Sequence, residues 1–184
     1  GGDIDRLSAV WGTFYPVFDV VRPFTRVYAP SPKAWLFLVA WYRDAMTRYA
    51  DWWLETARRH FGDAELYVCT GGNMIVEHGS DFSAQAKVAA KHGAGLRVTN
   101  EGSHFPKNVF LTRLVQSACR YYGAFSGTEP AREFSPLGSM GRLFNAHGGG
   151  SRQIFTHFIR EGLEEELFRR CRPFISTATP RYEL

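Results

Sequence analysis

The feature that most restricts the fold of this 184-residue chain is a unit of one short strand and one helix, repeated four times. The unit recurs about every thirty residues, a spacing typical of strands that alternate with helices. The expected strands are 65–70, 95–100, 122–126 and 152–158, and the expected helices are 81–92, 108–121, 136–147 and 161–172. Such alternation predicts a parallel α/β sheet with right-handed crossovers.

The same spacing is that of a (β/α)8 barrel, in which each unit takes roughly 31 residues and the whole barrel about 250. The chain is too short for a barrel but has room for half of one. The alternative is an open doubly wound sheet of four or five strands. Against it, the segment Gly93-Ala94-Gly95 lies between a helix and a strand, the wrong order for a dinucleotide-binding loop.

Two segments precede the repeated units, and all three parts are interpreted as one partial domain. Residues 1–32 are expected to form a loop-rich arm broken by prolines, residues 33–62 a long helix, and residues 63–184 the four β/α units. Ser31 is a fair N-cap for the long helix. The aromatic stripe of this helix is expected to be buried in the core, and the charged residues of the helix are expected to face away from the core. The stripe comprises Trp35, Leu38, Val39, Tyr42, Met46, Tyr49, Trp52 and Trp53; the charged residues are Arg43, Asp44, Arg48, Asp51 and Glu55.

Composition excludes several classes of protein. The chain has 45% hydrophobic and 22% charged residues and a net charge of +4. It is therefore neither a disordered chain nor a strongly acidic or basic chain that binds a polymer. Its basic residues are dispersed, which argues against nucleic acid as a partner. The longest apolar run, residues 34–42, is far too short to span a membrane, so no membrane partner is expected. The first residues resemble no signal peptide, which favours a cytoplasmic location.

No metal or cofactor is expected. The three cysteines, Cys69, Cys119 and Cys171, are widely separated, and the six histidines include no HExxH or HxH pair. Neither a disulfide framework nor a zinc site has such spacing.

Polar residues that could carry chemistry follow the ends of the expected strands, where barrel enzymes place their active sites. They are Asn73 and Glu77, Asn100 and Glu101, Glu129, and His157. Carboxylates past two neighbouring strands suit sugar hydrolysis, which needs one acid and one nucleophile or base. The alternative for each Glu is a surface or helix-capping carboxylate, and for His157 a structural histidine.

Three segments resemble β-galactosidase-type glycoside hydrolases, family 42 and its relatives. Residues 2–13, GDIDRLSAVWGT, resemble the family's GDI..LN.AWGT segment. The helix containing WYRDAM (41–46) and YADWW (49–53) resembles the fourth barrel helix, and residues 142–155 resemble the last helix-to-strand passage. The resemblance implies that the four strands are strands five to eight, the C-terminal half of the barrel.

The resemblance also implies roles for individual residues. Glu129 corresponds to the nucleophile at the end of strand seven. The family's acid/base is the Glu of an Asn-Glu pair on strand four, whereas Asn100-Glu101 lies one strand before Glu129, so this pair is expected to contact substrate. Trp11 is a candidate sugar platform, and Asn73, Glu77 and His157 are further candidates for substrate binding.

The function implied is part of a retaining glycoside hydrolase that acts on a carbohydrate, with β-galactosides favoured, by double displacement. The acid/base is expected upstream of Gly1, so the chain alone is expected to be nearly inactive and to need the missing N-terminal half-barrel or an oligomeric partner. The alternative is a non-catalytic carbohydrate-binding or structural half-barrel.

Overall fold

A computed structural model describes residues 2–71, 75–99, 105–129, 136–154 and 169. The helices are α1 (Ile4–Trp11), α2 (Pro32–Phe61), α3 (Phe82–Lys91), α4 (Phe105–Tyr122) and α5 (Pro136–Gly148), and the strands are β1 (Tyr67–Thr70), β2 (Gly95–Val98), β3 (Phe125–Thr128) and β4 (Gln153–Ile154). Single 3₁₀ turns occur at Phe18–Val20, Arg26–Tyr28 and Val76–His78. Of the fourth predicted unit, residues 152–154 of the strand are described, and of helix 161–172 only residue 169 is described.

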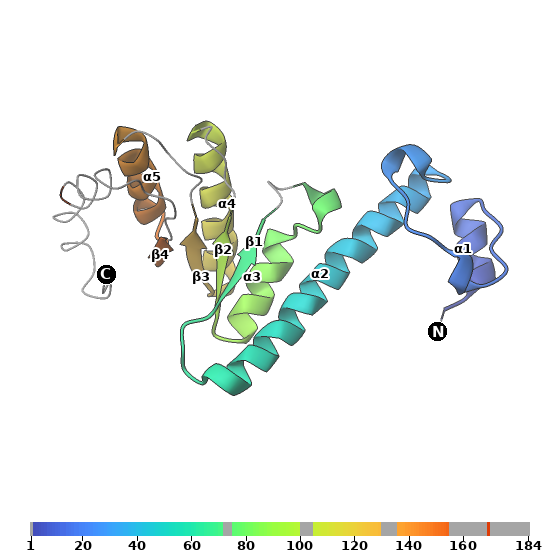
Figure 1. Cartoon of the computed structure of the whole chain (residues 1–184), viewed down its shortest axis with the longest axis horizontal. Coiled ribbons are helices and arrows are strands. Elements are labelled where there is room, and N and C mark those ends of the chain that lie inside the picture. Colours follow the sequence, from blue (N-terminus) through green and yellow to red (C-terminus); the bar gives the residue numbers. More distant parts are fainter. Residues whose placement is uncertain (1, 72–74, 100–104, 130–135, 155–168, 170–184) are drawn as a thin grey trace.

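The four strands form one parallel sheet in the order β1-β2-β3-β4 (Figure 1). Each strand pairs with the next one along the chain, as strands do in a (β/α)8 barrel. A doubly wound sheet would instead reverse its strand order at a switch point. The structure therefore confirms the predicted half-barrel and not the open-sheet alternative.

The main core lies between the sheet and helices α3 and α4. Leu96 and Val98 of β2 are 0% and 2% exposed and pack against apolar side chains of both helices. Those side chains are Phe82, Ala86 and Ala89 of α3 and Leu111, Val115 and Cys119 of α4. Burial of this cluster fixes which face of the sheet the helices cover.

Helix α2 begins as the sequence predicts, because Ser31 Oγ accepts a hydrogen bond from the Ala34 N–H at 3.1 Å. At its other end, the Arg58 guanidinium donates to the carbonyls of Gly62 (2.6 Å) and His92 (3.1 Å). One side chain thereby satisfies carbonyls beyond the ends of both α2 and α3, and fixes the two helix ends together.

The expectation that the aromatic stripe of α2 is core is wrong for much of its length. Tyr49 and Trp52 are 56% and 57% exposed, whereas the small side chains Ala50 and Ala57 are buried. Asp51, expected to face away, bonds α3 instead. The stripe members Tyr42 and Trp53 are also exposed.

Ion pairs explain why α2 does not bury its aromatic face. Arg43 Nη2 lies 2.5 Å from Asp81 Oδ2, and Asp51 Oδ1 lies 2.8 Å from Lys91 Nζ. Both contacts join α2 to the ends of α3, so charged residues that a periodic pattern assigns to solvent line the interface. Ion pairs at both ends of α3 therefore hold it against α2.

Asp81 is the N-cap of α3, and the preceding Ser80 has a different role. Asp81 Oδ1 accepts from the Ala84 N–H at 3.0 Å, while Ser80 Oγ donates to the Gly71 carbonyl at 2.8 Å. Ser80 therefore holds the loop after β1 against the start of α3. Among the helices that the structure describes, none combines the length and apolarity needed to cross a membrane.

Candidate functional site

The sheet has a second face, opposite the helices, which we call the inner face. Side chains alternate along a strand, so Arg97, between the core residues Leu96 and Val98, points to this side. The strand register aligns the other members with it. The inner face comprises Tyr67, Cys69, Gly95, Arg97, Phe125, Gly127 and Glu129.

Glu129 lies directly after β3, at the carboxyl edge of the sheet. Its backbone N–H donates to the Val98 carbonyl at 2.8 Å, so the residue continues the pairing of β3 with β2. Continued pairing fixes the direction in which the Glu129 side chain leaves the backbone. This edge is where (β/α)8 barrels carry their catalytic groups.

An ion pair joins Glu129 to Arg97. Arg97 Nη2 lies 3.1 Å from Glu129 Oε2, and the two side chains are only 17% and 16% exposed. The same Nη2 donates to Cys69 Sγ at 2.9 Å. The guanidinium thus connects three strands and orients the Glu129 carboxylate while balancing its charge.

Glycines make room for a tyrosine in the next layer of the inner face. A Cβ at Gly95 would lie 2.3 Å from Tyr67 Cε1, and one at Gly127 would lie 3.2 Å from the same atom. The Tyr67 ring therefore lies over the backbone of β2 and reaches β3. It occupies the space that side chains at the two glycines would otherwise take.

Charged residues close the opposite end of the inner face. Arg152 Nη2 lies 3.1 Å from Glu65 Oε2, and the Arg152 guanidinium stacks 4.0 Å from the centre of the Phe125 ring. The Tyr67 hydroxyl donates to Glu65 Oε1. Glu65 is therefore the carboxylate at the amino end of the inner face, and Glu129 is the carboxylate at its carboxyl edge.

Of the residues predicted from sequence, the described structure places only Glu129 on the inner face. Glu77 is half-buried in the turn Val76–His78, which packs against α2. Asn73, Asn100, Glu101 and His157 lie outside the described residues. Sequence reasoning missed Arg97, although a charged residue between Leu96 and Val98 indicates a side chain pointing away from the core.

Trp11 is buried within the arm. Its ring is 7% exposed and packs edge-on against Phe24 and Tyr15, with centroids 5.6 and 6.3 Å away. Figure 1 shows α1 at the end of α2 remote from the sheet. Contact of Trp11 with a sugar stays a prediction.

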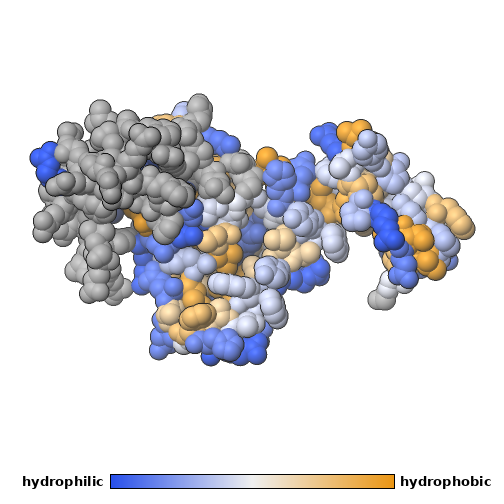
Figure 2. Space-filling view, viewed as in Figure 1, coloured by the Kyte–Doolittle hydropathy of each residue, from blue (hydrophilic) through white to orange (hydrophobic). Residues whose placement is uncertain are grey.

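Apolar side chains of the arm, such as Phe14 and Val27, are exposed, and Figure 2 shows hydrophobic surface on the arm, at the right of the view.

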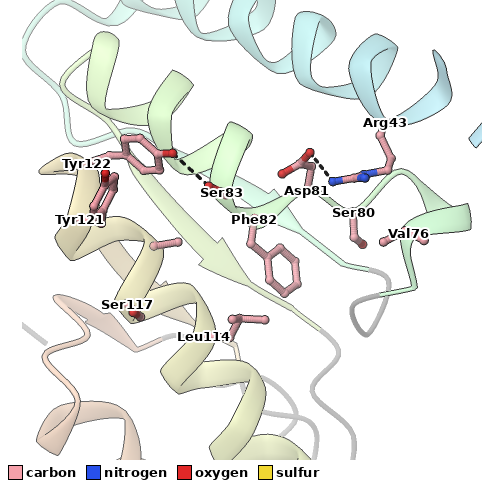
Figure 3. A pocket seen from close by; sticks show the side chains of 11 residues that line it. Arg43, Val76, Ser80, Asp81, Phe82, Ser83, Leu114, Ser117, Tyr121 and Tyr122 are labelled. Atoms are coloured by element: carbon pink, nitrogen blue, oxygen red, sulfur yellow. Dashed lines mark hydrogen bonds and ion pairs between the residues drawn. The ribbon is translucent and has the colours of Figure 1, made fainter. Parts of the chain in front are cut away.

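A groove of about 600 Å³ lies on the helix side of the sheet, between α3 and α4 (Figure 3). Four of its polar side chains are paired with one another. Arg43 bonds Asp81, and the Ser83 and Tyr122 hydroxyls are 3.0 Å apart. The groove is separated from Glu129 by the sheet, so it is not part of the strand-end site.

Neither a metal-ligand cluster nor the core thiol Cys119 lies at this site in the part of the chain that the structure describes. Within the described ranges, no three His, Cys, Asp or Glu side chains gather as metal ligands would. Cys119 is buried in the core, and burial raises the pKa of its thiol to about 11. A thiol with so high a pKa is protonated at neutral pH and inert.

The comparisons with known proteins bear on the fold. No protein-family model matches the sequence, and no curated protein matches it. The crystal structure of the catalytic domain of a β-amylase from Paenibacillus polymyxa is similar, with a TM-score of 0.72 and 16% identity, over 97% of this chain and 51% of that chain. The chain therefore has the fold of about half of that β-amylase catalytic domain. The match gives no support to the β-galactosidase-type family that the sequence motifs resemble.

Proposed function

We propose that this chain is the C-terminal half of the catalytic barrel of a glycoside hydrolase, with Glu129 as its nucleophile. The observation that carries the proposal is the position of Glu129 at the carboxyl edge of a sequentially ordered parallel sheet, on the face away from the helices. The likeness to a β-amylase catalytic domain supports the same class of reaction.

In the proposed reaction, a Glu129 oxygen attacks the anomeric carbon while a second carboxyl group protonates the departing oxygen. Water then hydrolyses the glycosyl ester, with the second group acting as base. The ion pair with Arg97 supports this role, because it directs the carboxylate and reduces the conformational freedom lost on attack. A retaining reaction needs the two carboxyl groups about 5–5.5 Å apart.

The second carboxyl group would belong to a strand three positions from β3, beyond β1. General acid catalysis contributes roughly 10²–10⁴-fold, so the 184-residue chain alone should turn over substrate slower by about that factor. The catalytic test therefore requires the longer polypeptide of which this chain would be part.

The sequence motifs favour β-galactosides as substrates. The similar structure is named an amylase, which adds starch-type glucans to the substrates worth testing. Hydrolysis of galactosides by the longer polypeptide would support the first class, and release of sugar from starch would replace it by the second.

The experiment treats the longer polypeptide with 2-deoxy-2-fluoroglycosides of both sugars and measures the mass of the peptide containing Glu129. A covalent adduct on Glu129, together with loss of hydrolysis in Glu129→Gln, is the expected result. Glu65→Gln, which removes a carboxylate at the other end of the inner face, is the matched control and should retain hydrolysis.

The outcomes separate the roles of Glu129. Loss of hydrolysis without an adduct would make Glu129 a general base in an inverting reaction, and not a nucleophile. Unchanged hydrolysis in Glu129→Gln would remove it from catalysis altogether.

One observation favours a second candidate, a non-catalytic carbohydrate-binding or structural half-barrel. Glu129 already has a cation partner within the chain, as a structural carboxylate would. On that interpretation, Glu129→Gln lowers stability, and the longer polypeptide binds sugars without cleaving them.

A further inference from the structure

The groove of about 600 Å³ between α3 and α4, which we call the α3–α4 groove, has the size of a binding site for a small molecule. Such sites typically enclose about 300–1,000 Å³. Phe82, which is only 7% exposed, forms an apolar floor, and Leu114 of α4 faces it (Figure 3). The sheet separates the groove from Glu129, so a ligand here would not occupy the strand-end site.

A tyrosine ring is exposed at one end of the groove. Tyr121 is 82% exposed, and its ring packs edge-on against the ring of Tyr122, with centroids 4.8 Å apart. This contact restricts the orientation of Tyr121, so one flat apolar face is already positioned before a ligand binds. Tyrosine provides such a face at a low cost in conformational entropy, because only two of its torsions must be fixed.

Hydroxyl groups lie beside this ring. The Ser83 and Tyr122 hydroxyls are 3.0 Å apart and bond one another. Each hydroxyl has one donor and two acceptor positions, so their mutual bond uses one of two donors and one of four acceptor positions. Ser117, four residues before Tyr121 on α4, is exposed and adds a third hydroxyl to the lining. The groove therefore offers both donors and acceptors to a ligand.

The charges of the groove compensate one another. Of the described residues that line it, only Arg43 and Asp81 are ionised, and they form an ion pair at the end opposite Tyr121 (Figure 3). No excess charge is left to attract a phosphate group or a metal ion. The Arg43 guanidinium has five N–H donors, and Asp81 accepts from one nitrogen, so further donors are available to a ligand. A neutral polar ligand is therefore favoured over an ionic one.

A neutral sugar has the chemistry that these features match. A pyranose ring presents a face of C–H groups that packs on an aromatic ring, and hydroxyls around its rim that both donate and accept. We propose that the α3–α4 groove binds a neutral oligosaccharide, with one sugar ring stacked on Tyr121 and its hydroxyls bonded by Ser83 and Ser117. The site lies outside the strand-end site and does not depend on whether Glu129 cleaves sugars.

The test records nitrogen–proton correlation spectra of the 184-residue chain during titration with maltoheptaose and with a galactan tetramer. Binding in the groove is recognised by shifts at residues 80–83 and 117–122. We expect saturable shifts at both segments with at least one of the two oligosaccharides. A tetramer of galacturonic acid, matched in length to the galactan but charged, should bind no more tightly at about 0.15 M salt.

Three variants locate the contact. Tyr121→Ala should weaken binding by about fivefold, because it removes the stacking surface, whereas Tyr121→Phe retains the ring and should bind as the wild type does. Tyr28→Ala is the matched control, since Tyr28 is 80% exposed and lies in the arm outside the groove, and it should leave binding unchanged. Circular dichroism of each variant verifies that the helices remain folded.

Four results would overturn the proposal. They are absence of shifts with both neutral oligosaccharides, shifts confined to residues outside the groove, equal weakening by Tyr121→Ala and Tyr28→Ala, and tighter binding of the galacturonic acid tetramer than of the galactan tetramer in the groove. The last result would make the ligand an acidic one. Because none of these measurements uses hydrolysis, failure here is distinct from failure of the proposed function.

Discussion

The guanidinium of Arg97, in the middle of β2, lies 3.1 Å from the carboxylate of Glu129, just past the end of β3. Both side chains are less than one-fifth exposed, so removal of either leaves the other charge poorly solvated. The pair also fixes the only predicted catalytic residue that the described structure places on the inner face. Its energetic role can be measured without any substrate.

A double-mutant cycle on Arg97 and Glu129 should show a coupling free energy of about 1–2 kcal/mol, because each partner compensates the desolvation of the other. Arg97→Met and Glu129→Gln are each expected to lower the free energy of unfolding, and the double variant to cost less than their sum. Urea unfolding of the four proteins measures the coupling. Strictly additive effects would show that the pair contributes nothing to stability.

Gly95→Ala should destabilise the chain by about 1–3 kcal/mol, the usual cost of overpacking. The added methyl group would meet Tyr67 Cε1 at 2.3 Å and the Phe125 carbonyl at 3.1 Å. The penalty should shrink when Tyr67 is also changed to Ala. Gly141→Ala is the control and should be neutral or stabilising, because Gly141 lies within α5 and the nearest atom to the added methyl group would be Phe105 Cε2 of α4, at 3.7 Å. Thermal unfolding compares the variants.

Asp51 makes stability depend on acid. Hydrogen bonds from Lys91 and then from His92 lower the pKa of Asp51 below its usual 3.8. A carboxyl whose folded pKa is depressed stabilises the fold above its unfolded pKa, and this stabilisation is lost as pH falls through the lower, folded pKa. The Asp51 side chain is 35% exposed, so we expect Asp51→Asn to cost below about 1 kcal/mol at pH 7.

The difference between wild type and Asp51→Asn should persist from pH 7 to pH 5 and close as pH falls below about 3.8. Urea unfolding at a series of pH values measures it. Asp44→Asn, which breaks an ion pair within α2 at an exposed site, is the matched control and should have a smaller effect. A difference that widened in acid would contradict the assignment.

The two described cysteines should differ strongly in reactivity. Cys69 is exposed on the inner face, whereas Cys119 is buried and burial raises its thiol pKa to about 11. In a Cys171→Ser variant at pH 8, a disulfide reagent should modify one thiol rapidly and the second only on unfolding. Peptide mass mapping identifies which cysteine reacted, and rapid labelling of Cys119 would show that the core between α3 and α4 opens readily.

Much of the fold could be predicted from the sequence because its signals are local. Caps and glycine stops, such as Ser31 and Gly62 around α2, mark helix ends through short-range hydrogen bonds. The strand spacing near thirty residues then leaves few topologies for a parallel sheet. The period therefore predicted the observed strand order.

The packing of α2 could not be predicted in this way. The helix has two faces that could be buried, and the hydrophobic pattern favours the one with rings. In the structure, small residues such as Ala50 are buried, and Arg43 and Asp51 find opposite charges at the two ends of α3. Such pairing depends on which elements become neighbours, and periodicity within one helix contains no information about that.

The candidate site divides in the same way. Glu129 is a sequence candidate because it follows a strand, a local property, whereas the contact of Arg97 with it depends on the register between β2 and β3. Register becomes known only when the strands are assembled.

The Tyr67 ring over Gly95 and Gly127 has a consequence for how such a chain can evolve. A side chain larger than hydrogen at Gly95 meets the ring, so this position is closed to substitution while the tyrosine is present. Loss of the ring would have to come first and would open space above two strands at once. Homologues that diverged here should therefore have changed the three positions together, with larger residues in β2 or β3 accompanied by a smaller residue in β1.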